Sequence, residues 1–226
     1  MMSAGCKIIR DFKRPDPELV RLFDGIPVAN IDDCMGRIAA VNNEIYPLGK
    51  NPLLGIAFTI RVPQGDNLLL HAAMDMAKPG DVIMLDAGGF TDRAIFGELM
   101  CTYMRSRGIQ GIVCDGAVRD SEALSMMENF AVYAKGVTPN GPYKNGPGEI
   151  NVPVVIGDKV VFPGDIIVGD GDGVIIIRPD QARDIAFQAK EIVKKEEEIM
   201  RRIVEEGTYI RPWVQEKVEE IGFEIE

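Results

Sequence analysis

Histidine, tryptophan and paired cysteines are nearly missing from this chain. Among 226 residues there are one histidine, one tryptophan and four cysteines, and no two cysteines form a Cys-x-x-Cys pair. Zinc sites and Ser-His-Asp triads are built on imidazoles, so a single histidine argues against both. We expect His71 to be a packed or half-exposed residue of the apolar stretch 67–78. Cysteines without such spacing, in a chain of this size, indicate reduced thiols and a cytoplasmic protein.

Basic charge and long apolar runs are also scarce. The 25 lysines and arginines are outnumbered by 35 acidic residues, which gives a formal net charge of −10. A nucleic-acid-binding domain needs a basic surface, so we expect no nucleic acid partner. An anionic substrate would have to be held locally, by a metal ion, an arginine or helix amides. No apolar run approaches the ~18 residues of a membrane span, and the first residues lack the apolar core of a signal peptide, so we expect no membrane association.

The length and the apolar periodicity predict one α/β domain over residues 1–226, with its core at about 20–207. Asp16 and Pro17 suit the start of a helix, and several connections are too short for parallel crossovers. Helices are expected at 17–43 with a break at 25–30, and at 67–78, 91–108, 121–130 and 180–207. Strands are expected at 55–62, 79–86, 111–115, 131–137, 163–170 and 173–179, with a loop over 138–153 and a hairpin about Gly157-Asp158.

Gly97 interrupts the helical stretch 91–108. A glycine is acceptable at an N-cap. If the helix proper begins there, the amides of Glu98, Leu99 and Met100 are free donors at the positive end of the helix dipole, which is a ready site for a carboxylate. The alternative is a glycine tolerated inside one longer helix or placed for close packing, and on this signal alone that alternative is the stronger.

An arginine and an aspartate, Arg119 and Asp120, stand side by side just after the expected strand 111–115. Loops at the ends of adjacent strands often converge, so we expect this pair to lie near Gly97. An arginine fork suits a carboxylate or an enolate oxygen, and an aspartate offers hard oxygen ligands for Mg²⁺ or Mn²⁺. The plainer interpretation is a surface pair that caps a helix at Ser121.

The motif resembles that of a known family of lyases. With Glu98 as the acid and Arg119-Asp120 as the pair, the spacing is similar to the acid-X20-Arg-Asp pattern of the class II pyruvate aldolases. These are the divalent-metal-dependent 4-hydroxy-4-methyl-2-oxoglutarate/4-carboxy-4-hydroxy-2-oxoadipate aldolases, in the superfamily of the regulator of ribonuclease activity (RraA-like). The resemblance covers most of residues 20–207 and includes the segments GIVCDGAVRD and PGDIIVGDGDGVIIIRP. It implies a layered β/β/α sandwich, swivelling-domain-like, with a long C-terminal helix.

The resemblance implies a role for each position of the motif. Asp120 would ligate the metal ion, Mg²⁺ or Mn²⁺. Arg119 would bind the pyruvyl oxygens and stabilise the enolate. Leu99 and Met100, after Gly97, would lend backbone amides to the substrate carboxylate. Glu98 matches the acidic residue of the family that holds a water molecule.

Family members also use a glutamate from the C-terminal helix of a neighbouring subunit. In the run KKEEEIMRR (194–202) this would be Glu197 or Glu196, of which we favour Glu197, while the plain interpretation of such a run is a solvated helix face. The resemblance therefore implies a homo-oligomer, a trimer or hexamer, with residues 180–226 in its contacts. One difference from the family is Phe96, where a tryptophan is common, and we expect it to alter packing more than chemistry.

The function implied is retro-aldol cleavage of a 4-hydroxy-2-oxo acid to pyruvate and a carbonyl product, with oxaloacetate decarboxylation through the same enolate. An alternative is a protein-binding regulator of a ribonuclease, without catalysis; that branch of the superfamily generally lacks the aspartate that matches Asp120. A methyltransferase acting on a demethylated quinone is a further alternative, which we discount because DAGGFTD is a poor match to a glycine-rich nucleoside-binding loop. The sequence does not choose the physiological substrate.

Overall fold

The computed structural model describes residues 5–224. The chain divides between Ala189 and Lys190 into two compact units, each of which is described by itself. The strands are β1 (Cys6–Ile8), β2 (Tyr46–Pro47), β3 (Leu53–Arg61), β4 (Asp81–Phe96), β5 (Gly111–Val118), β6 (Ala131–Val137), β7 (Gly148–Ile150), β8 (Val154–Ile156), β9 (Lys159–Val161), β10 (Ile166–Asp170) and β11 (Gly173–Ile177). The helices are α1 (Pro17–Arg21), α2 (Val28–Cys34), α3 (Leu68–Met76), α4 (Glu98–Ser106), α5 (Ser121–Ser125), α6 (Ala182–Glu206) and α7 (Pro212–Ile221).

One mixed sheet organises the first unit. Its order is β1-β7-β3-β4-β5-β6-β2, and β10 pairs with both β3 and β11. Strands β3, β4, β5 and β6 run parallel, whereas β10, β7 and β2 pair antiparallel with their neighbours β3, β3 and β6. The hairpin β8–β9 forms a small second sheet. The chain is thus the α/β protein that the sequence predicts.

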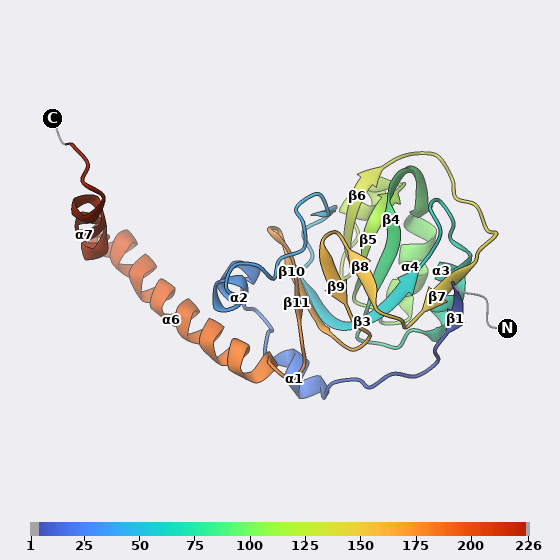
Figure 1. Cartoon of the computed structure of the whole chain (residues 1–226), viewed down its shortest axis with the longest axis horizontal. Helices are drawn as coiled ribbons and strands as arrows, with labels where there is room; N and C mark the ends of the chain where they lie inside the picture. The colour runs from blue at the N-terminus through green and yellow to red at the C-terminus, as the bar shows by residue number, and fades with distance from the viewer. Residues whose placement is uncertain (1–4, 225–226) are drawn as a thin grey trace. The chain divides into compact units, whose positions relative to one another are not determined.

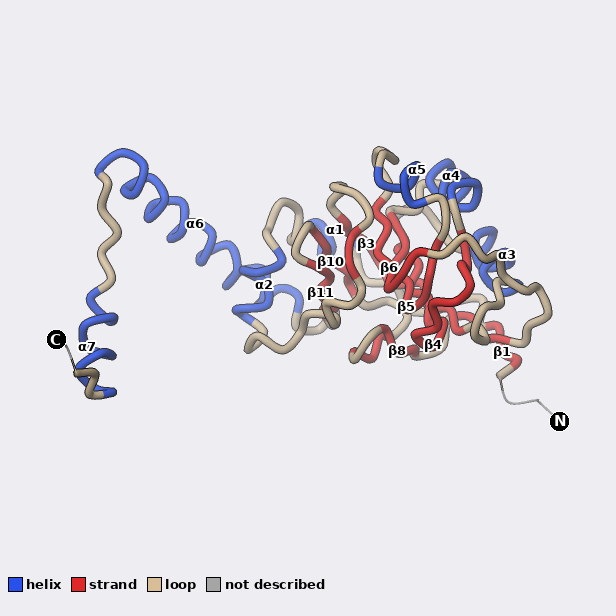
Figure 2. The backbone as a smooth tube through the Cα atoms, turned by 90° about the horizontal axis from the view of Figure 1, so that it is seen from above, coloured by secondary structure: helices blue, strands red, loops and turns tan. Residues whose placement is uncertain are grey.

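Apolar side chains on the two faces of the sheet form two cores. On one face, residues such as Leu70, Cys101 and Leu124 bring α3, α4 and α5 onto the strands. On the other face, residues such as Val154 and Ile176 pack the hairpin and β11 against the same strands. Figure 2 shows the three helices together on one side of the sheet and β8 on the opposite side, and Figure 1 shows α3 and α4 among the strands of the same unit. This layering is the β/β/α sandwich implied by the family resemblance.

Strand β4 is longer than the sequence predicts. The expected helix at 91–108 is wrong over its first residues, because β4 continues to Phe96 and α4 begins only at Glu98. Gly88 and Gly89 have φ angles of 67° and 68°, a left-handed conformation that glycine adopts without steric cost. They allow β4 to bend, and its register with β5 shifts three times between Asp86 and Phe96. The bend carries the end of β4 to the edge where the candidate site lies.

Other boundaries differ in smaller ways. The predicted helical region 17–43 forms two short helices, and it is wrong beyond α2, where Arg37 takes a φ of 61°. The predicted helix 121–130 stops at Ser125, and the loop 138–153 contains the short strand β7. The predicted N-cap is confirmed, since the Asp16 carboxylate accepts a hydrogen bond from the Glu18 amide at 2.9 Å.

The second unit, residues 190–226, holds the rest of α6 and all of α7. The predicted helix at 180–207 is confirmed as α6. Within it, hydrogen bonds from Arg201 and Arg202 lower the pKa of the Glu198 carboxyl to about 2. Large apolar side chains of this unit are exposed, for example Ile210 at 75% and Trp213 at 63%.

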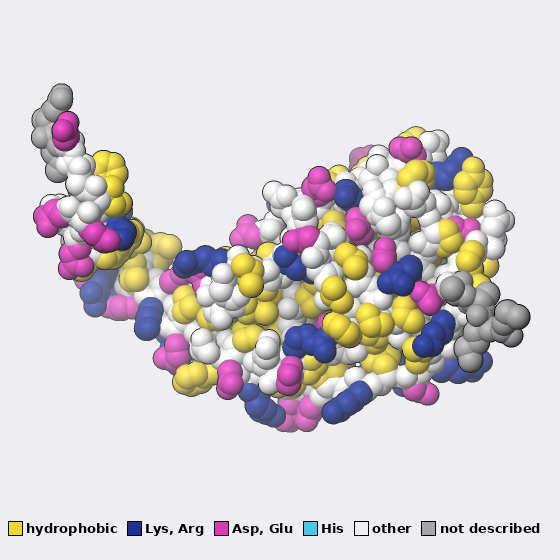
Figure 3. Space-filling view, viewed as in Figure 1, with side chains coloured by type: hydrophobic (Ala, Val, Ile, Leu, Met, Phe, Trp, Pro, Cys, Tyr) yellow, Lys and Arg dark blue, Asp and Glu magenta, His cyan; other side chains and the backbone are white. Residues whose placement is uncertain are grey.

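The expectations of no nucleic acid partner and no membrane association stay predictions. Over the first unit, the face shown in Figure 3 mixes Lys and Arg side chains with Asp and Glu rather than gathering them into a basic field. Among residues 5–224, no helix is both long and apolar enough to cross a membrane.

Candidate functional site

The ends of β4 and β5 lie side by side, as the sequence predicts. Phe96 pairs with Val118 at the end of both strands, and the Arg119 amide donates a hydrogen bond to the Phe96 carbonyl at 3.1 Å. Gly97 follows one strand and Arg119 the other. The glycine that opens α4 and the Arg-Asp pair therefore meet at one edge of the sheet.

Gly97 leaves room for the neighbouring carboxylate. A Cβ atom at this position would lie 2.2 Å from Oδ2 of Asp120 and 2.9 Å from Cγ of Arg119, closer than real side chains approach. Its φ of −158° is open to any residue, so the glycine is needed for space and not for conformation. The view of Gly97 as a residue inside a longer helix is wrong, because it is the N-cap of α4.

Asp120 has an unusual backbone conformation. It occupies the N-cap position of α5 with φ 59° and ψ 37°, yet its side chain makes no capping hydrogen bond to that helix. Instead, its Oδ2 accepts a hydrogen bond from the Glu98 amide at 3.0 Å. Left-handed backbone costs most residues ~1–2 kcal/mol, and aspartate tolerates it better than most. The expected cap before Ser121 is confirmed for the backbone position of Asp120. It is wrong for the side chain, since the carboxylate faces the first turn of α4.

The first turn of α4 offers two backbone donors. The expectation of three free amides is corrected, because the amide of Glu98 is bonded to Asp120. For the amides of Leu99 and Met100 the structure records no acceptor within residues 5–224, as is usual for the first turn of a helix. Both residues line the same cavity as Arg119. These donors, at the positive end of the helix, suit a carboxylate.

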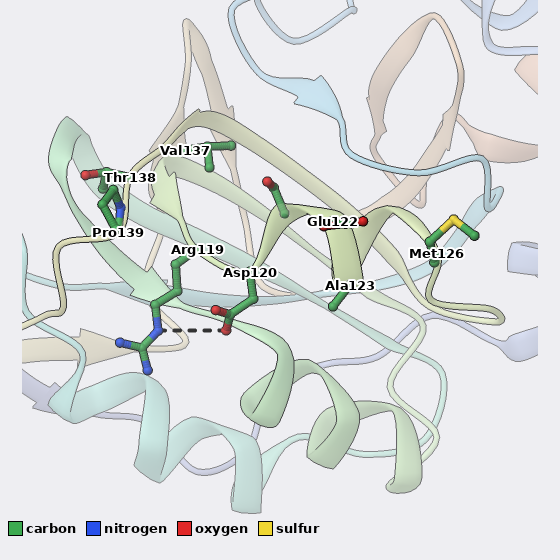
Figure 4. A pocket seen from close by; sticks show the side chains of 9 residues that line it. Arg119, Asp120, Glu122, Ala123, Met126, Val137, Thr138 and Pro139 are labelled. Carbon is green, nitrogen blue, oxygen red and sulfur yellow. Dashed lines mark ion pairs between the residues drawn. The ribbon is translucent and has the colours of Figure 1, made fainter.

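The Arg119 side chain lies beside Asp120 and in reach of a ligand. Its Nε is 3.8 Å from Oδ2 of Asp120, and the two side chains are 47% and 42% exposed. Figure 4 shows both side chains directed to the same side, while Met126 lies away from them. An exposed pair at this distance contributes ~0–1 kcal/mol to stability. The guanidinium therefore remains available for an anionic ligand.

Two hollows meet at this pair. A cavity of about 340 Å³ is bounded by the pair, by the start of α4, by α3 and by residues 141–144. A wider and more open hollow of about 830 Å³, drawn in Figure 4, shares Arg119 and Asp120 and extends over α5 to Pro139. The smaller cavity lies at the lower end of the ~300–1,000 Å³ typical of ligand pockets. We take it as the candidate site.

Three polar residues of the cavity were missed from the sequence: Asn67, His71 and Lys144. The expectation of a packed or half-exposed His71 is wrong, because the residue is exposed on α3 and lines the cavity. The four-residue spacing of Asn67 and His71 places them on one side of the start of α3, a signal that the sequence does contain. Lys144 sits in an irregular loop, where no periodicity marks it.

Asn67 is buried with one polar atom unpaired. The residue is 3% exposed, and its Nδ2 donates to the Ile95 carbonyl at 2.8 Å. Its Oδ1 has no hydrogen-bond partner among the described residues. A buried acceptor without a donor costs ~1–3 kcal/mol, and such atoms often mark functional sites.

The remaining sequence-predicted residues are three glutamates, Glu98, Glu196 and Glu197. The Glu98 side chain is exposed and lines neither hollow. Glu196 and Glu197 belong to the second unit, and the structure describes one chain, so their place in a neighbouring site stays a prediction. Beneath the site, burial and then the charge of Asp120 raise the pKa of the Cys101 thiol, which leaves no thiolate there to act as a nucleophile.

The donors present suit one mode of metal binding. Within residues 5–224, no three or more His, Cys, Asp or Glu side chains group so that they could hold a metal ion. Asp120 is the one carboxylate among the described residues that line the cavity. Mg²⁺ is commonly held by one or two carboxylates, with water and substrate oxygens completing its shell. Asp120 fits that mode and does not fit an all-protein cage.

Comparison with known proteins shows which family the chain belongs to. The profile of the Aldolase/RraA family, RraA-like, matches residues 28–176. A protein of Halalkalibacterium halodurans, provisionally named a 4-hydroxy-4-methyl-2-oxoglutarate aldolase, is 36% identical over 202 residues, which is 89% of this chain and 96% of the relative.

Solved structures share the fold. RraAS2 of Streptomyces coelicolor, described as an unusual member of the RNase ES inhibitor RraA protein family, superposes with a TM-score of 0.72 and 28% identity over 84% of this chain and 100% of that one. An uncharacterized protein of Pseudomonas syringae superposes with a TM-score of 0.73 at 22% identity, over 85% of this chain and 95% of that one, which shows the fold alone. This chain is an α/β protein of the RraA-like type. It belongs to the Aldolase/RraA family.

Proposed function

We propose that this protein is a divalent-metal-dependent pyruvate aldolase, a carbon–carbon lyase that splits a 4-hydroxy-2-oxo acid such as 4-hydroxy-4-methyl-2-oxoglutarate. The observation that carries the proposal is the placement of Asp120, a left-handed residue whose carboxylate reaches past Gly97 to the first turn of α4, beside Arg119. A surface ion pair requires neither that backbone conformation nor the glycine. The name of the relative from Halalkalibacterium halodurans supports the same activity.

Substrate binding follows from the donors at this edge. The free amides of Leu99 and Met100 would bind the C1 carboxylate of the substrate, and the Arg119 guanidinium would donate to its C2 oxygen. Asp120 would hold Mg²⁺ or Mn²⁺. A divalent cation there supplies Lewis-acid stabilisation of negative charge on a carbonyl oxygen.

Bond cleavage needs a proton acceptor and charge stabilisation. The proton of the C4 hydroxyl passes to a carboxylate, which we assign to Glu98 or to a neighbouring chain's helix glutamate. The C3–C4 bond then breaks, C4 becomes a carbonyl, and the electron pair moves toward the C2 oxygen, where Arg119 stabilises the charge. A proton returned to C3 completes pyruvate. Oxaloacetate loses CO₂ with the same build-up of charge, so decarboxylation is expected as a second activity.

We further propose that the active form is a homo-oligomer, a trimer or hexamer, in which Glu197 or Glu196 of one chain completes the site of another. Three facts support this: Asp120 is the one carboxylate on the described cavity lining, the hollow beside it is open, and the second unit exposes apolar side chains such as Trp213. Mixing the inactive variants Asp120→Ala and Glu197→Ala tests this. Recovery of activity in the mixed oligomer supports shared sites, and a fully active monomer in light scattering refutes them.

The main experiment removes the metal and its ligand in turn. Chelator-treated protein should lose pyruvate formation from oxaloacetate and from the aldol substrate, and should regain it with Mg²⁺ or Mn²⁺. Asp120→Ala should stay inactive at any substrate concentration, while the exposed control Asp24→Ala keeps normal turnover. Full activity after exhaustive chelation, or normal turnover in Asp120→Ala, contradicts the proposal.

The second candidate is an RraA-type regulator that binds a ribonuclease without catalysis. The likeness to the Streptomyces coelicolor protein favours it. It predicts no turnover of 2-oxo acids with any divalent metal, together with inhibition of an RNase E-type endonuclease by the purified chain. The same protein preparation therefore separates the two functions.

A further inference from the structure

The loop 138–147 contains the same tripeptide twice. Asn140-Gly141-Pro142 and Asn145-Gly146-Pro147 hold the two Asn-Gly sequences of the chain, and both asparagines are exposed. In an Asn-Gly sequence the backbone nitrogen of the glycine can attack the side-chain amide carbon of the asparagine, because glycine has no Cβ to hinder the approach. Since the tripeptides are identical, a difference in reactivity between them comes chiefly from the fold.

The reaction is a deamidation, with water as its one co-reactant. The glycine amide loses its proton, its nitrogen forms a bond to Cγ of the asparagine, and the Cγ–Nδ2 bond breaks. Nδ2 leaves as ammonia and takes up a proton, so a cyclic imide remains. Water then opens the imide at either carbonyl, and the product is an aspartate or an isoaspartate, each with a negative charge that asparagine lacks. The first step is easier wherever the glycine amide loses its proton more readily.

The amide of Gly146 is bound to a buried carboxylate. Asp66 is 3% exposed, and its Oδ2 accepts hydrogen bonds from the amides of Gly146 at 3.1 Å and Asn145 at 2.6 Å. Its Oδ1 accepts the Leu68 amide at 2.9 Å, so both oxygens are held in place. A negative charge beside an amide opposes the loss of its proton, and a hydrogen bond to the protonated form does the same. The fold therefore protects Asn145.

The amide of Gly141 lies near a cation instead. The structure records no acceptor for this amide among residues 5–224. Gly141 lies against the Arg119 guanidinium, since a Cβ on the glycine would be 3.5 Å from Nη1 of Arg119. A positive charge so close favours the deprotonated amide, which is the nucleophile of the reaction. The fold thus leaves Asn140 open to deamidation and promotes its first step.

Asn140 itself is held between β4 and the candidate site. Its Nδ2 donates to the Asp92 carbonyl at 3.0 Å, and its carbonyl accepts the Ala94 amide at 2.8 Å. These bonds leave Cγ and the Gly141 nitrogen unengaged. After deamidation an oxygen replaces Nδ2 opposite the Asp92 carbonyl, and because two acceptors cannot bond, the new carboxylate has to turn away. Its neighbours Pro139 and Gly141 line the wider hollow and the candidate cavity, so the change falls between the two.

We propose that Asn140 is a site of spontaneous deamidation and that Asp66 protects Asn145 from the same reaction. The charge created at residue 140 lies near Arg119 and weakens the binding of anions at the candidate site. In isoaspartate the backbone also gains a carbon, which shifts the cavity wall. The modification concerns the chain alone, whereas its effect on turnover rests on the proposed function.

The test follows both sites in one protein by mass spectrometry. The full chain is incubated at physiological temperature and mildly alkaline pH, and trypsin then separates the sites, because it cleaves after Lys135, Lys144 and Lys159. One peptide holds Asn140 and the next holds Asn145. Each deamidation adds one dalton, and isoaspartate is detected with an isoaspartyl methyltransferase. The same chain unfolded in urea is the control, in which the rates at the two sites should approach each other.

In the folded chain Asn140 should react ~10-fold faster than Asn145 or more, since a tenfold change in ionisation needs only about 1.4 kcal/mol of charge interaction. Equal rates at the two sites, a faster rate at Asn145, or an unmodified Asn140 while the unfolded chain reacts overturns the inference.

Two variants test the assigned causes. Asp66→Asn keeps an oxygen and removes the charge, so the rate at Asn145 should rise, while the exposed control Asp184→Asn changes neither rate. Arg119→Met, at an exposed pair, should slow the reaction at Asn140 alone. Circular dichroism checks that each variant is folded. An unchanged rate at Asn145 in folded Asp66→Asn, or at Asn140 in Arg119→Met, refutes the cause assigned there.

Turnover is a separate readout. Chains deamidated at residue 140 carry an added negative charge and are separated by anion exchange. Their kcat/KM for oxaloacetate should be ~10-fold lower or more, whereas Asn140→Gln, whose longer side chain closes a ring less readily, should keep its activity on storage. An unchanged kcat/KM in the modified fraction removes the effect on the site alone. No turnover in fresh protein removes the aldolase proposal together with that effect, and leaves the modification standing.

Discussion

Two arginine–aspartate pairs lie near opposite ends of β4, and they differ in burial, in the distance between their charged atoms and in their hydrogen-bond partners. At the first residue of β4, Asp81 is fully buried and is bound by both terminal nitrogens of Arg14. The guanidinium also stacks on Phe12, with its carbon 4.3 Å from the ring centre. At the other end, Arg119 and Asp120 follow β5 and lie beside Phe96, the last residue of β4. Their charged atoms are 3.8 Å apart, and both side chains are nearly half exposed.

The same two residue types have different roles in the two pairs. We call Arg14–Asp81 the closed pair, because its charged groups are bonded within the fold, and Arg119–Asp120 the open pair. Asp81 also accepts a hydrogen bond from the Lys78 amide at 2.8 Å, so both charged groups of this pair have partners within the fold. Asp120 takes a left-handed backbone to direct one oxygen at α4, and Arg119 keeps free donors. A closed pair serves the packing of the N-terminal segment onto the sheet, whereas an open pair serves a ligand. Substitutions matched between the two ends test this difference.

The largest expected effect is on stability, at the closed pair. Arg14→Met keeps most of the apolar stem but leaves the Asp81 carboxylate buried without its cation. Breaking a buried pair from one side costs about 3–5 kcal/mol. Urea denaturation followed by circular dichroism should show a lower midpoint with an unchanged slope. The same substitution at the open pair, Arg119→Met, should change the unfolding free energy by ~0–1 kcal/mol.

A double variant tests whether the loss of stability in Arg14→Met comes from the unpaired carboxylate of Asp81. Arg14→Met with Asp81→Asn leaves no buried charge and retains an acceptor for the Lys78 amide, so it should be less destabilised than Arg14→Met alone. If both variants lose the same stability, the loss comes from the packing of Arg14 on Phe12 rather than from the unpaired carboxylate.

The next effect is on turnover, at the open pair. Arg119→Lys keeps the positive charge and loses the planar fork. Loss of one oriented donor to a developing oxyanion costs ~10²–10³ in kcat, so this decrease is expected for oxaloacetate and for the aldol substrate, with Mn²⁺ affinity unchanged. A lysine variant with normal kcat would mean that only the charge at position 119 matters.

A smaller effect on turnover is expected from substitution of Gly97, which lies between β4 and α4. In Gly97→Ala the new Cβ would meet Oδ2 of Asp120 at 2.2 Å, so the carboxylate must move away from the Glu98 amide. We expect kcat/KM to fall ~10-fold or more, about 1.4 kcal/mol, with Mn²⁺ affinity lowered in parallel. Gly171→Ala is the control, because nothing lies within 4 Å of the Cβ that it would add at this exposed position. Equal activity of the two variants contradicts the role given to Gly97.

The fold was predictable where one hydrophobic periodicity, that of a strand or that of a helix, extends over a whole segment. The strand at 131–137 and the helix at 180–207 follow from alternation and helical spacing, and both are confirmed. The segment 91–96 was not, because its spacing fits a helix and only the bend at Gly88 and Gly89 keeps it in the sheet. That bend depends on the pairing with β5, which local sequence does not reveal.

The site was predictable in part for a similar reason. Gly97 and Arg119 were expected to meet because each follows one of two adjacent strands. The left-handed backbone of Asp120 and its bond to the Glu98 amide depend on how α4 and α5 pack, and spacing carries no such information. Lys144 was missed because its position is set by long-range hydrogen bonds to Asp66, which no local pattern in a loop records.

The smallest expected effect concerns another buried carboxylate, that of Asp115, which has no arginine fork like the one that binds Asp81. Asp115 accepts the Gly157 amide at 3.1 Å, but its Oδ1 has no hydrogen-bond partner among the described residues and lies 3.9 Å from the Lys135 ammonium. Burial raises the pKa of the Asp115 carboxyl, against the opposing effects of the Gly157 amide and Lys135. A raised pKa favours the protonated form in the folded state. Its contribution to stability is therefore full below the ordinary aspartate pKa, ~3.9, and is lost as the pH rises through the raised value.

Asp115→Asn removes this titration while keeping an acceptor for the Gly157 amide, and Lys135 retains Glu44 at 3.0 Å. The variant should thus gain stability relative to the wild type between pH 4 and pH 7, by less than Arg14→Met loses. Urea midpoints of both proteins at the two pH values give this difference, in which the titration of all other carboxylates cancels. Asp24→Asn, at an exposed position, is the control for the substitution itself. A variant that loses stability relative to the wild type as the pH rises would show that Lys135 outweighs burial, and Asp115 would then be a closed partner like Asp81.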